Sequence, residues 1–213
     1  MKKLHLGCGQ RYLDGYINID FPLSEHSVQL ESVADEHHDI TELHYQKNSI
    51  AEVRLHHVFE HFERPMACAL VASWNSWLME NGTLHIEVPD FEKTAKAALS
   101  RFKNTNQKKV AIRHLFGSHE AEWAVHAEGY SRWLLGDLLE TFGFKIVKIL
   151  TNSWRGTYNI ELIAQKEKDI AYEQCDDMAA KYLEGFLLDE SEKPMLDIWL
   201  RLFQEQLQVC FAK

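Results

Sequence analysis

The chain has 213 residues, 46% of them hydrophobic and 26% charged, which is enough for one well-buried globular domain. Its net charge of −9 argues against nucleic acid or another large polyanion as a partner, because phosphate binding depends on clustered lysine and arginine. No apolar stretch approaches the roughly 18 residues of a membrane-spanning helix, and no signal-peptide pattern follows the basic start. We therefore expect a cytoplasmic protein with no membrane association, in which the four cysteines are reduced thiols.

The first predicted elements are two buried strands separated by a glycine loop. The apolar run of residues 3–6 breaks into Gly7 and Gly9, where the backbone can approach a ligand without a Cβ in the way. A second apolar run, residues 17–19, ends at Asp20, which we place at the C-terminal tip of the neighbouring parallel strand. Ligands of open α/β sheets bind outside such tips, so glycines at one tip and an acid at the next predict a nucleoside-type site.

The spacing of these residues bears on which nucleoside is bound. A dinucleotide site expects Gly-x-Gly-x-x-Gly, a full helix and an acid about 20 residues further on. Here Tyr12 stands in place of the third glycine and Asp20 comes too early. The interval from Gly7 to Tyr16 also leaves no room for a long helix to hold a pyrophosphate. A ligand with a ribose and no phosphates, such as S-adenosylmethionine, fits better: Asp20 would accept both ribose hydroxyls, and the loop backbone would hold the amino-acid end.

Alternating helix and strand patterns continue to about residue 165, as expected of a small α/β enzyme. In order, we expect a helix over 24–34, a short strand that reaches Asp39, a strand over 50–57, a helix over 64–80, a strand over 83–88, a helical segment over 92–116 broken near 104–106, a helix over 131–141, and a hairpin of 144–150 and 158–165. The segment 117–130 shows little periodicity and is predicted to form a lid over the pocket.

The last 47 or so residues differ in character and are predicted to form two helical segments, 170–188 and 194–211. We therefore divide the chain into a domain over 1–166 and a C-terminal helical extension over 167–213. An apolar stripe on the second segment must be covered by the domain, by the first segment or by another subunit, so packing within the chain and a homodimer are both open. The stripe consists of Met195, Ile198, Trp199, Leu202, Phe203, Val209 and Cys210.

Taken in order, these pieces resemble the class I S-adenosylmethionine-dependent methyltransferases, especially small proteins of the methyltransferase type 11 kind. The matching pieces are 4–9, 19–20, 38–40, 57–62, 81–90 and 143–144, so the resemblance covers about residues 1–165. It implies a Rossmann-like α/β fold: a seven-stranded, mostly parallel sheet with a terminal antiparallel hairpin and helices on both faces. It also implies methyl transfer, with S-adenosylmethionine as the cofactor.

The resemblance assigns the cofactor-binding positions to the strand tips. They are Leu6, Gly7, Cys8, Gly9, Asp20, Asp39, Ile40 and His57. In the family, the acid that matches Asp39 meets the adenine amino group. A purely structural alternative is that Asp39 caps the turn at Thr41 and Glu42.

Catalysis requires mainly positioning of the acceptor, because a sulfonium methyl donor is already reactive. A hydroxyl acceptor also benefits from a base, and histidine titrates near neutral pH. The candidate catalytic residues are therefore His57, His61, His126 on the lid, and Asp90 after the fifth strand. We expect a small-molecule or sugar-like acceptor, with oxygen slightly favoured over nitrogen. For each of these residues, packing, capping or solvent exposure is an equal alternative.

A cluster of His56, His57, Glu60 and His61 also invites a metal hypothesis, since His57 and His61 would share one face of a helix that started after the strand. Twelve histidines make chance clusters common, and we predict no metal site.

Two other functions remain open from the sequence. A nicotinamide-dependent oxidoreductase is disfavoured by the glycine spacing. A non-catalytic nucleoside-binding or assembly protein that keeps the methyltransferase fold is favoured by His5 and Arg11, which depart from the family pattern.

Overall fold

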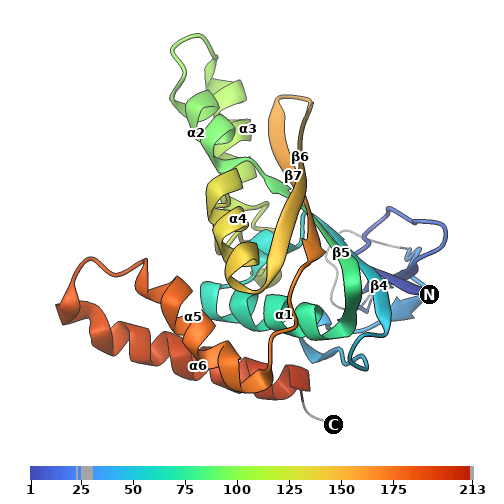
Figure 1. Ribbon diagram of the computed structural model, residues 1–213. Coiled ribbons are helices and arrows are strands. Elements are labelled where there is room, and N and C mark those ends of the chain that lie inside the picture. The colour runs from blue at the N-terminus through green and yellow to red at the C-terminus, as the bar shows by residue number, and fades with distance from the viewer. Residues whose placement is uncertain (23, 25–30, 212–213) are drawn as a thin grey trace.

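The computed structural model describes residues 1–22, 24 and 31–211. The strands among these residues form one seven-stranded sheet of order β3-β2-β1-β4-β5-β7-β6 (Figure 1). The first five strands run parallel, whereas β7 pairs antiparallel with both β5 and β6. This arrangement confirms the predicted mostly parallel sheet with a terminal hairpin. The strands are β1 (Lys2–Leu6), β2 (Ile17–Asp20), β3 (Glu36–His37), β4 (Ile50–His56), β5 (Leu78–Pro89), β6 (Phe144–Trp154) and β7 (Thr157–Lys166).

The helices follow the predicted order, with some shifted ends. They are α1 (Arg64–Trp77), α2 (Phe91–Leu99), α3 (Thr105–Phe116), α4 (Arg132–Thr141), α5 (Cys175–Glu184) and α6 (Lys193–Phe211). The helical segment over 92–116 is broken where expected, because the Asn104 side chain accepts from Gln107 N and starts α3. β5 begins five residues earlier than predicted, since Leu78 already pairs with Ile50. None of the described helices is long and apolar enough to cross a membrane.

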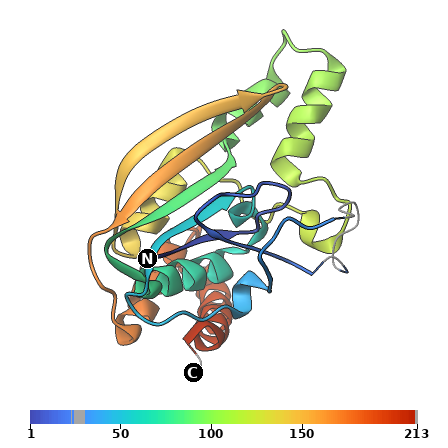
Figure 2. The same ribbon diagram turned by 90° about the vertical axis from the view of Figure 1, so that its right-hand side faces the viewer.

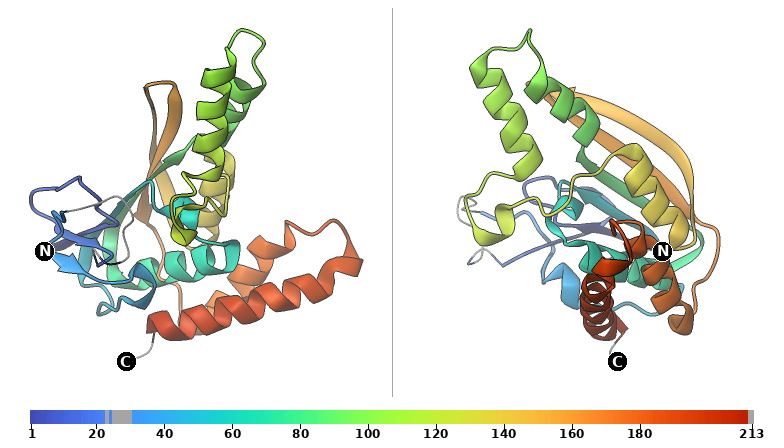
Figure 3. Two further views of the ribbon diagram at one scale, coloured as in Figure 1. Left: turned by 180° about the vertical axis from the view of Figure 1, so that it is seen from behind. Right: turned by 90° about the vertical axis from the view of Figure 1, so that its left-hand side faces the viewer.

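The two faces of the sheet differ in polarity. Among the described residues, α1, α4, α5 and α6 lie on one side of the sheet (Figures 1 and 3). The helix predicted over 24–34 falls mostly outside the described residues, and residues 31–35 are not helical. Alternation along the central strands directs apolar side chains such as Leu55 and Ile86 to the helix side. It directs His5, His56 and His85 to the opposite face.

Helix α1 is the centre of the core. Every residue from Ala67 to Asn75 is buried, because α1 lies between the sheet and α6 (Figure 3). The buried residues of α6 are Phe203, Leu207 and Cys210. Part of the predicted apolar stripe is therefore covered within the same chain, while Ile198 and Val209 stay about half exposed. Helices α5 and α6 contribute residues to the same hydrophobic core as the rest of the chain. The division at residue 166 and a homodimer through these helices remain predictions.

Helices α2 and α3 stand beside the far end of the β6–β7 hairpin (Figure 2). The chain returns from this arm through residues 117–130, which run back towards the carboxyl end of β4: the backbone amides of Ala127 and Glu128 donate to the carbonyl of Glu60 at 2.8 and 3.2 Å. The segment predicted as a lid is thus attached to the end of the parallel strands, where the sequence places the ligand.

Candidate functional site

A cavity of about 420 Å³ lies at the carboxyl ends of β1, β2 and β4. This size is within the usual range for small-molecule sites, and the position is where open α/β sheets bind ligands. The predicted site residues that line the cavity are Gly7, Cys8, Gly9, Asp20, Asp39, Ile40, His57 and His61. Glu120 and Trp123 line it from the segment 117–130, so this segment covers part of the cavity, as predicted.

The two glycines of the first loop have different roles. Both have positive φ, +66° at Gly7 and +54° at Gly9. A Cβ on Gly7 would lie 2.3 Å from Cγ2 of Val58, so Gly7 is required by packing against the segment after β4. A Cβ on Gly9 would meet nothing within 4 Å. Gly9 is therefore the position where the backbone is open to the cavity.

Asp20 holds the glycine loop from the tip of β2. Its side chain is 5% exposed; Oδ2 accepts from the backbone N–H of Gly9 at 2.9 Å and Oδ1 from that of Phe21 at 2.9 Å. Asp20 also lines the cavity beside Gly9. The loop and the acid, which the sequence placed at two adjacent tips, are thus joined into one unit.

Asp39 caps the turn at Thr41, as the structural alternative predicted, and it also lines the cavity. Its Oδ1 accepts from the backbone N–H and the hydroxyl of Thr41 at 2.8 and 2.7 Å, which caps the short 3₁₀ helix Ile40–Glu42. Ile40 is buried against the core and Asp39 and Ile40 both face the cavity from one side. An adenine contact at Asp39 stays a prediction.

His57 lies directly after β4 with a φ of +55°, a conformation that non-glycine residues rarely adopt. Its ring lies between two carboxylates: Nδ1 donates to Oε1 of Glu60 at 3.2 Å, and Nε2 is 3.4 Å from Oε1 of Glu87. Burial would lower the pKa of His57, but these two carboxylates raise it to about 10. His57 is therefore protonated near neutral pH and is poorly suited to act as a base.

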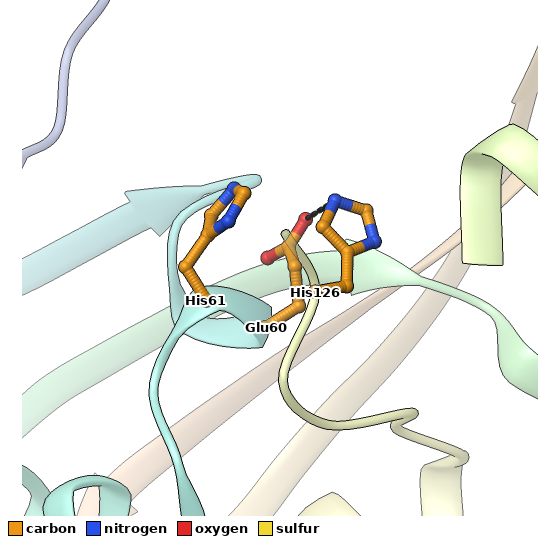
Figure 4. Close-up of side chains that lie close together, drawn as sticks. All are labelled: Glu60, His61 and His126. Carbon is orange, nitrogen blue, oxygen red and sulfur yellow. Dashed lines mark ion pairs between the residues drawn. The ribbon is translucent and has the colours of Figure 1, made fainter. Parts of the chain in front are cut away.

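A second cavity of about 280 Å³ adjoins the first, and His57, His61, Glu120 and Trp123 line both. Glu60, His61 and His126 meet there, with one ligand-type atom of each within 4.8 Å of the others (Figure 4). We call these three residues the Glu60 cluster. Nε2 of His126 is 3.8 Å from Oε1 of Glu60, and burial lowers the pKa of His126. The structure therefore joins His126 on the lid to the segment that follows β4.

Two predicted residues do not line either cavity. Leu6 is fully buried within β1, so its side chain belongs to the core. Asp90 caps α2, because its Oδ1 accepts from the backbone N–H of Lys93 at 2.9 Å. His56 lines the larger cavity but lies apart from the other members of the cluster considered as a metal site: alternation along β4 directs its ring to the polar face, where Nδ1 lies 3.0 Å from Nε2 of His5.

Glu87 and Phe21 are site residues that the sequence reasoning missed. Glu87 is 6% exposed in β5 and holds His57 from its second side; Arg11 also approaches it, with Nη1 4.0 Å from Oε2. Its signal was an acidic residue near the carboxyl end of a strand. Phe21 lines the cavity directly after Asp20 and has no comparable signal.

A chain of hydrogen bonds crosses the polar face of the sheet below the site. The guanidinium of Arg54 can only donate, so Nε2 of His56 accepts from it at 3.1 Å, and Nδ1 of His56 carries the proton. This proton is donated to Nε2 of His5, whose Nδ1 then donates to Oδ1 of Asn18 at 3.0 Å. Both imidazoles are neutral in this arrangement. His5 thus has a structural role in the sheet.

The histidines predict a stability maximum near pH 6.5. Burial, with Arg11 and Arg54, lowers the pKa of His56 to about 3, so the unfolded chain binds a proton that the folded chain does not as pH falls below 6.5. Stability is therefore lost between pH 6.5 and about 3. His57, with its raised pKa, contributes stability that is lost as pH rises from 6.5 to about 10.

Urea unfolding from pH 5 to 9 measures this profile. His56→Gln is expected to make the acid side less steep, while His85, whose pKa burial lowers to about 4, keeps part of the slope. The alkaline side should be unchanged. An acid side that is equally steep in the variant and the wild type would contradict the assignment to His56.

No family model matches the chain, and no curated protein matches its sequence. Among solved structures, an S-adenosylmethionine-dependent methyltransferase of Methanosarcina mazei is similar, with a TM-score of 0.51 at 14% identity over 78% of this chain and 92% of that one. The 1,6-didemethyltoxoflavin-N1-methyltransferase of Burkholderia thailandensis, with bound S-adenosylhomocysteine, gives 0.51 at 12% identity over 78% and 72%.

LepI in complex with S-adenosylmethionine gives a TM-score of 0.50 at 11% identity over 78% of this chain, which spans only 43% of the LepI chain. These likenesses confirm the fold expected from the motifs: the chain has the fold of the class I S-adenosylmethionine-dependent methyltransferases. Membership of the type 11 kind stays a prediction.

Proposed function

We propose that the protein transfers a methyl group from S-adenosylmethionine to a small-molecule or sugar-like acceptor, with oxygen favoured over nitrogen. The observation that carries the proposal is the unit made by Gly9 and Asp20. A buried carboxylate at the tip of β2 faces the same cavity as a backbone stretch with open space before it. A ribose and an adjoining amino-acid end would be held by these two features, and no phosphate site is needed.

The acceptor end of the site is the Glu60 cluster. The Nδ1 of His61 donates to the carbonyl of Val125 at 3.0 Å, so Nε2 carries the lone pair in the neutral ring. His61 lines both cavities, so the residue lies between the proposed cofactor site and the smaller cavity. A neutral imidazole there can take the proton of an acceptor hydroxyl as its oxygen attacks the methyl group. His57, held charged between Glu60 and Glu87, positions the segment.

Three alternative ligands or functions can be compared with this proposal. The polyanionic partner and the dinucleotide remain disfavoured by charge and spacing. A non-catalytic nucleoside-binding protein would use the same Gly9–Asp20 unit, and it differs from the enzyme only in lacking transfer to an acceptor. Arg11, which lines the cavity and approaches Glu87, is the departure from the family pattern that keeps this second function open.

Calorimetry tests the proposal. S-adenosylhomocysteine is expected to bind, reduced nicotinamide cofactor is expected not to bind, and labelled methyl groups should pass from S-adenosylmethionine to a pool of hydroxylated metabolites. Binding without transfer would favour the non-catalytic function, and absence of binding would remove both.

Gly9→Val should abolish binding of S-adenosylhomocysteine, because its side chain would occupy the open space before the loop. Gly15→Val is the matched control: Gly15 has a φ of +82° in the same loop, has open space around its Cβ position and does not line the cavity. Equal losses in the two folded variants would mean that backbone strain, and not occupation of the cavity, weakens binding.

A further inference from the structure

The Glu60 cluster contains a buried acceptor that the protein itself leaves unused. Glu60 is 1% exposed, and its Oε1 takes the contacts from His57 and His126. Across residues 1–22, 24 and 31–211, Oε2 has no hydrogen-bond partner. Figure 4 shows this second oxygen on the His61 side of the carboxylate. A buried carboxylate oxygen without a partner is costly, so it points to a ligand.

Each of the two histidines beside it has a ring nitrogen bonded to the backbone. His61 donates its Nδ1 proton to the carbonyl of Val125, which leaves Nε2 as its available ligand atom. His126 turns Nε2 towards Glu60 (Figure 4), while the backbone of Leu115 hydrogen-bonds the ring. Histidines that bind metals usually donate their other ring N–H to a carbonyl or carboxylate, because this fixes the tautomer. Both rings have a backbone partner of this kind, which leaves one nitrogen of each available to a metal.

The backbone holds the two halves of the cluster together. Glu60 and His61 come from the turn after β4, whereas His126 comes from the segment that returns from α3. The carbonyl of Glu60 accepts from the amides of Ala127 and Glu128, and His126 N donates to the carbonyl of Phe116 at 3.2 Å. The two backbone segments that carry the three side chains are therefore hydrogen-bonded to each other.

We propose that Glu60, His61 and His126 bind a divalent transition-metal cation. Two imidazoles and one carboxylate form a donor set that suits Zn²⁺ and related ions, whereas Mg²⁺ and Ca²⁺ prefer oxygen ligands throughout. The ligand atoms lie within 4.8 Å of one another. Bond lengths of about 2.0–2.1 Å in a tetrahedral site place ligands about 3.3 Å apart, so the cluster closes around the ion by small side-chain rotations.

Three protein ligands leave one coordination position open, as in catalytic zinc sites. Since His61 lines both cavities, a cation held by the cluster would lie next to the proposed cofactor site. Here the inference rests on the proposed function: an acceptor hydroxyl bound to the cation would have a lowered pKa and would lose its proton to solvent. Its oxygen would then form the new bond to the methyl carbon as the carbon–sulfur bond breaks. The imidazoles would act as ligands, in place of the base described above.

Titration with Co²⁺ and Zn²⁺, with no nucleoside present, tests the site. The wild-type chain is expected to bind one Co²⁺ tightly, with the visible absorption of a four- or five-coordinate ion that Zn²⁺ displaces. His61→Gln and His126→Gln should each weaken binding by at least about 100-fold, because loss of even an outer partner of a metal ligand costs about 10–100-fold. His119→Gln is the matched control, since His119 is an exposed histidine of the same segment, bonded to Phe116 and outside the cluster.

Equal affinity in the His61 and His126 variants and the wild type, with folding checked by circular dichroism, would overturn the proposal and assign any binding to surface histidines. Failure of the wild type to bind Co²⁺ would overturn it as well. Binding of S-adenosylhomocysteine to the same samples separates the two proposals: a chain that binds the nucleoside and no metal keeps the proposed function and loses the cation site.

Discussion

Asp20→Ala is expected to weaken the binding of S-adenosylhomocysteine by at least about 100-fold. The substitution would remove the buried carboxylate that is proposed to accept two hydrogen bonds from ribose hydroxyls. Each such bond to a charged acceptor is worth about 1.5–3 kcal/mol. The sum of about 3–6 kcal/mol exceeds a 100-fold change, which corresponds to about 2.8 kcal/mol. The substitution also removes the acceptor that holds the backbone N–H of Gly9. Isothermal calorimetry on the folded variant measures the effect.

Asp14→Ala is the control for this experiment. Asp14 is an exposed acid in the same loop and does not line the cavity, so affinity should be unchanged. Asp20→Asn keeps one oxygen that can accept from Gly9 but replaces the other by a donor, so an intermediate loss is expected. If Asp20→Ala were folded and bound as tightly as the wild type, the assigned cofactor site would be wrong, and the proposed methyl transfer would lose its main support.

Phe203→Ala is expected to lower the free energy of unfolding by about 3–5 kcal/mol, the usual cost of deleting a fully buried phenylalanine side chain. Phe203 is 0% exposed on the face of α6 that covers α1, and its ring lies 6.5 Å from that of Phe142. For a chain of this length the loss corresponds to a Tm about 6–20 °C lower. Urea and thermal unfolding give both quantities.

Leu202→Ala provides the matched control on the same helix. Leu202 is 38% exposed, so its truncation should cost much less than that of Phe203 if α6 packs only within its own chain. A homodimer through the exposed part of the stripe would make Leu202→Ala reduce the apparent mass in light scattering. Equal destabilisation by the two variants in a monomeric protein would contradict the observed packing of α6.

Much of the fold and one half of the site follow from local sequence patterns. The apolar runs that end in glycines and in Asp20 fix two strand tips, because parallel strands end at one edge of the sheet whatever surrounds them. The break before α3 and the cap at Ser131 are also local, since each depends on a side chain that bonds a backbone amide three residues later. These features needed no knowledge of distant contacts.

Only the tertiary structure decided the acceptor side of the site. His56 and His57 are adjacent in the sequence, but strand alternation and the positive φ of His57 send their rings to different partners. His126 joins Glu60 because hydrogen bonds bring back a segment that leaves the sheet through α2 and α3. Likewise, α6 covers α1 through contacts between residues far apart in the chain. Local patterns specify which backbone conformation a segment prefers. Contacts between side chains far apart in the sequence depend on how the helices and strands pack against one another.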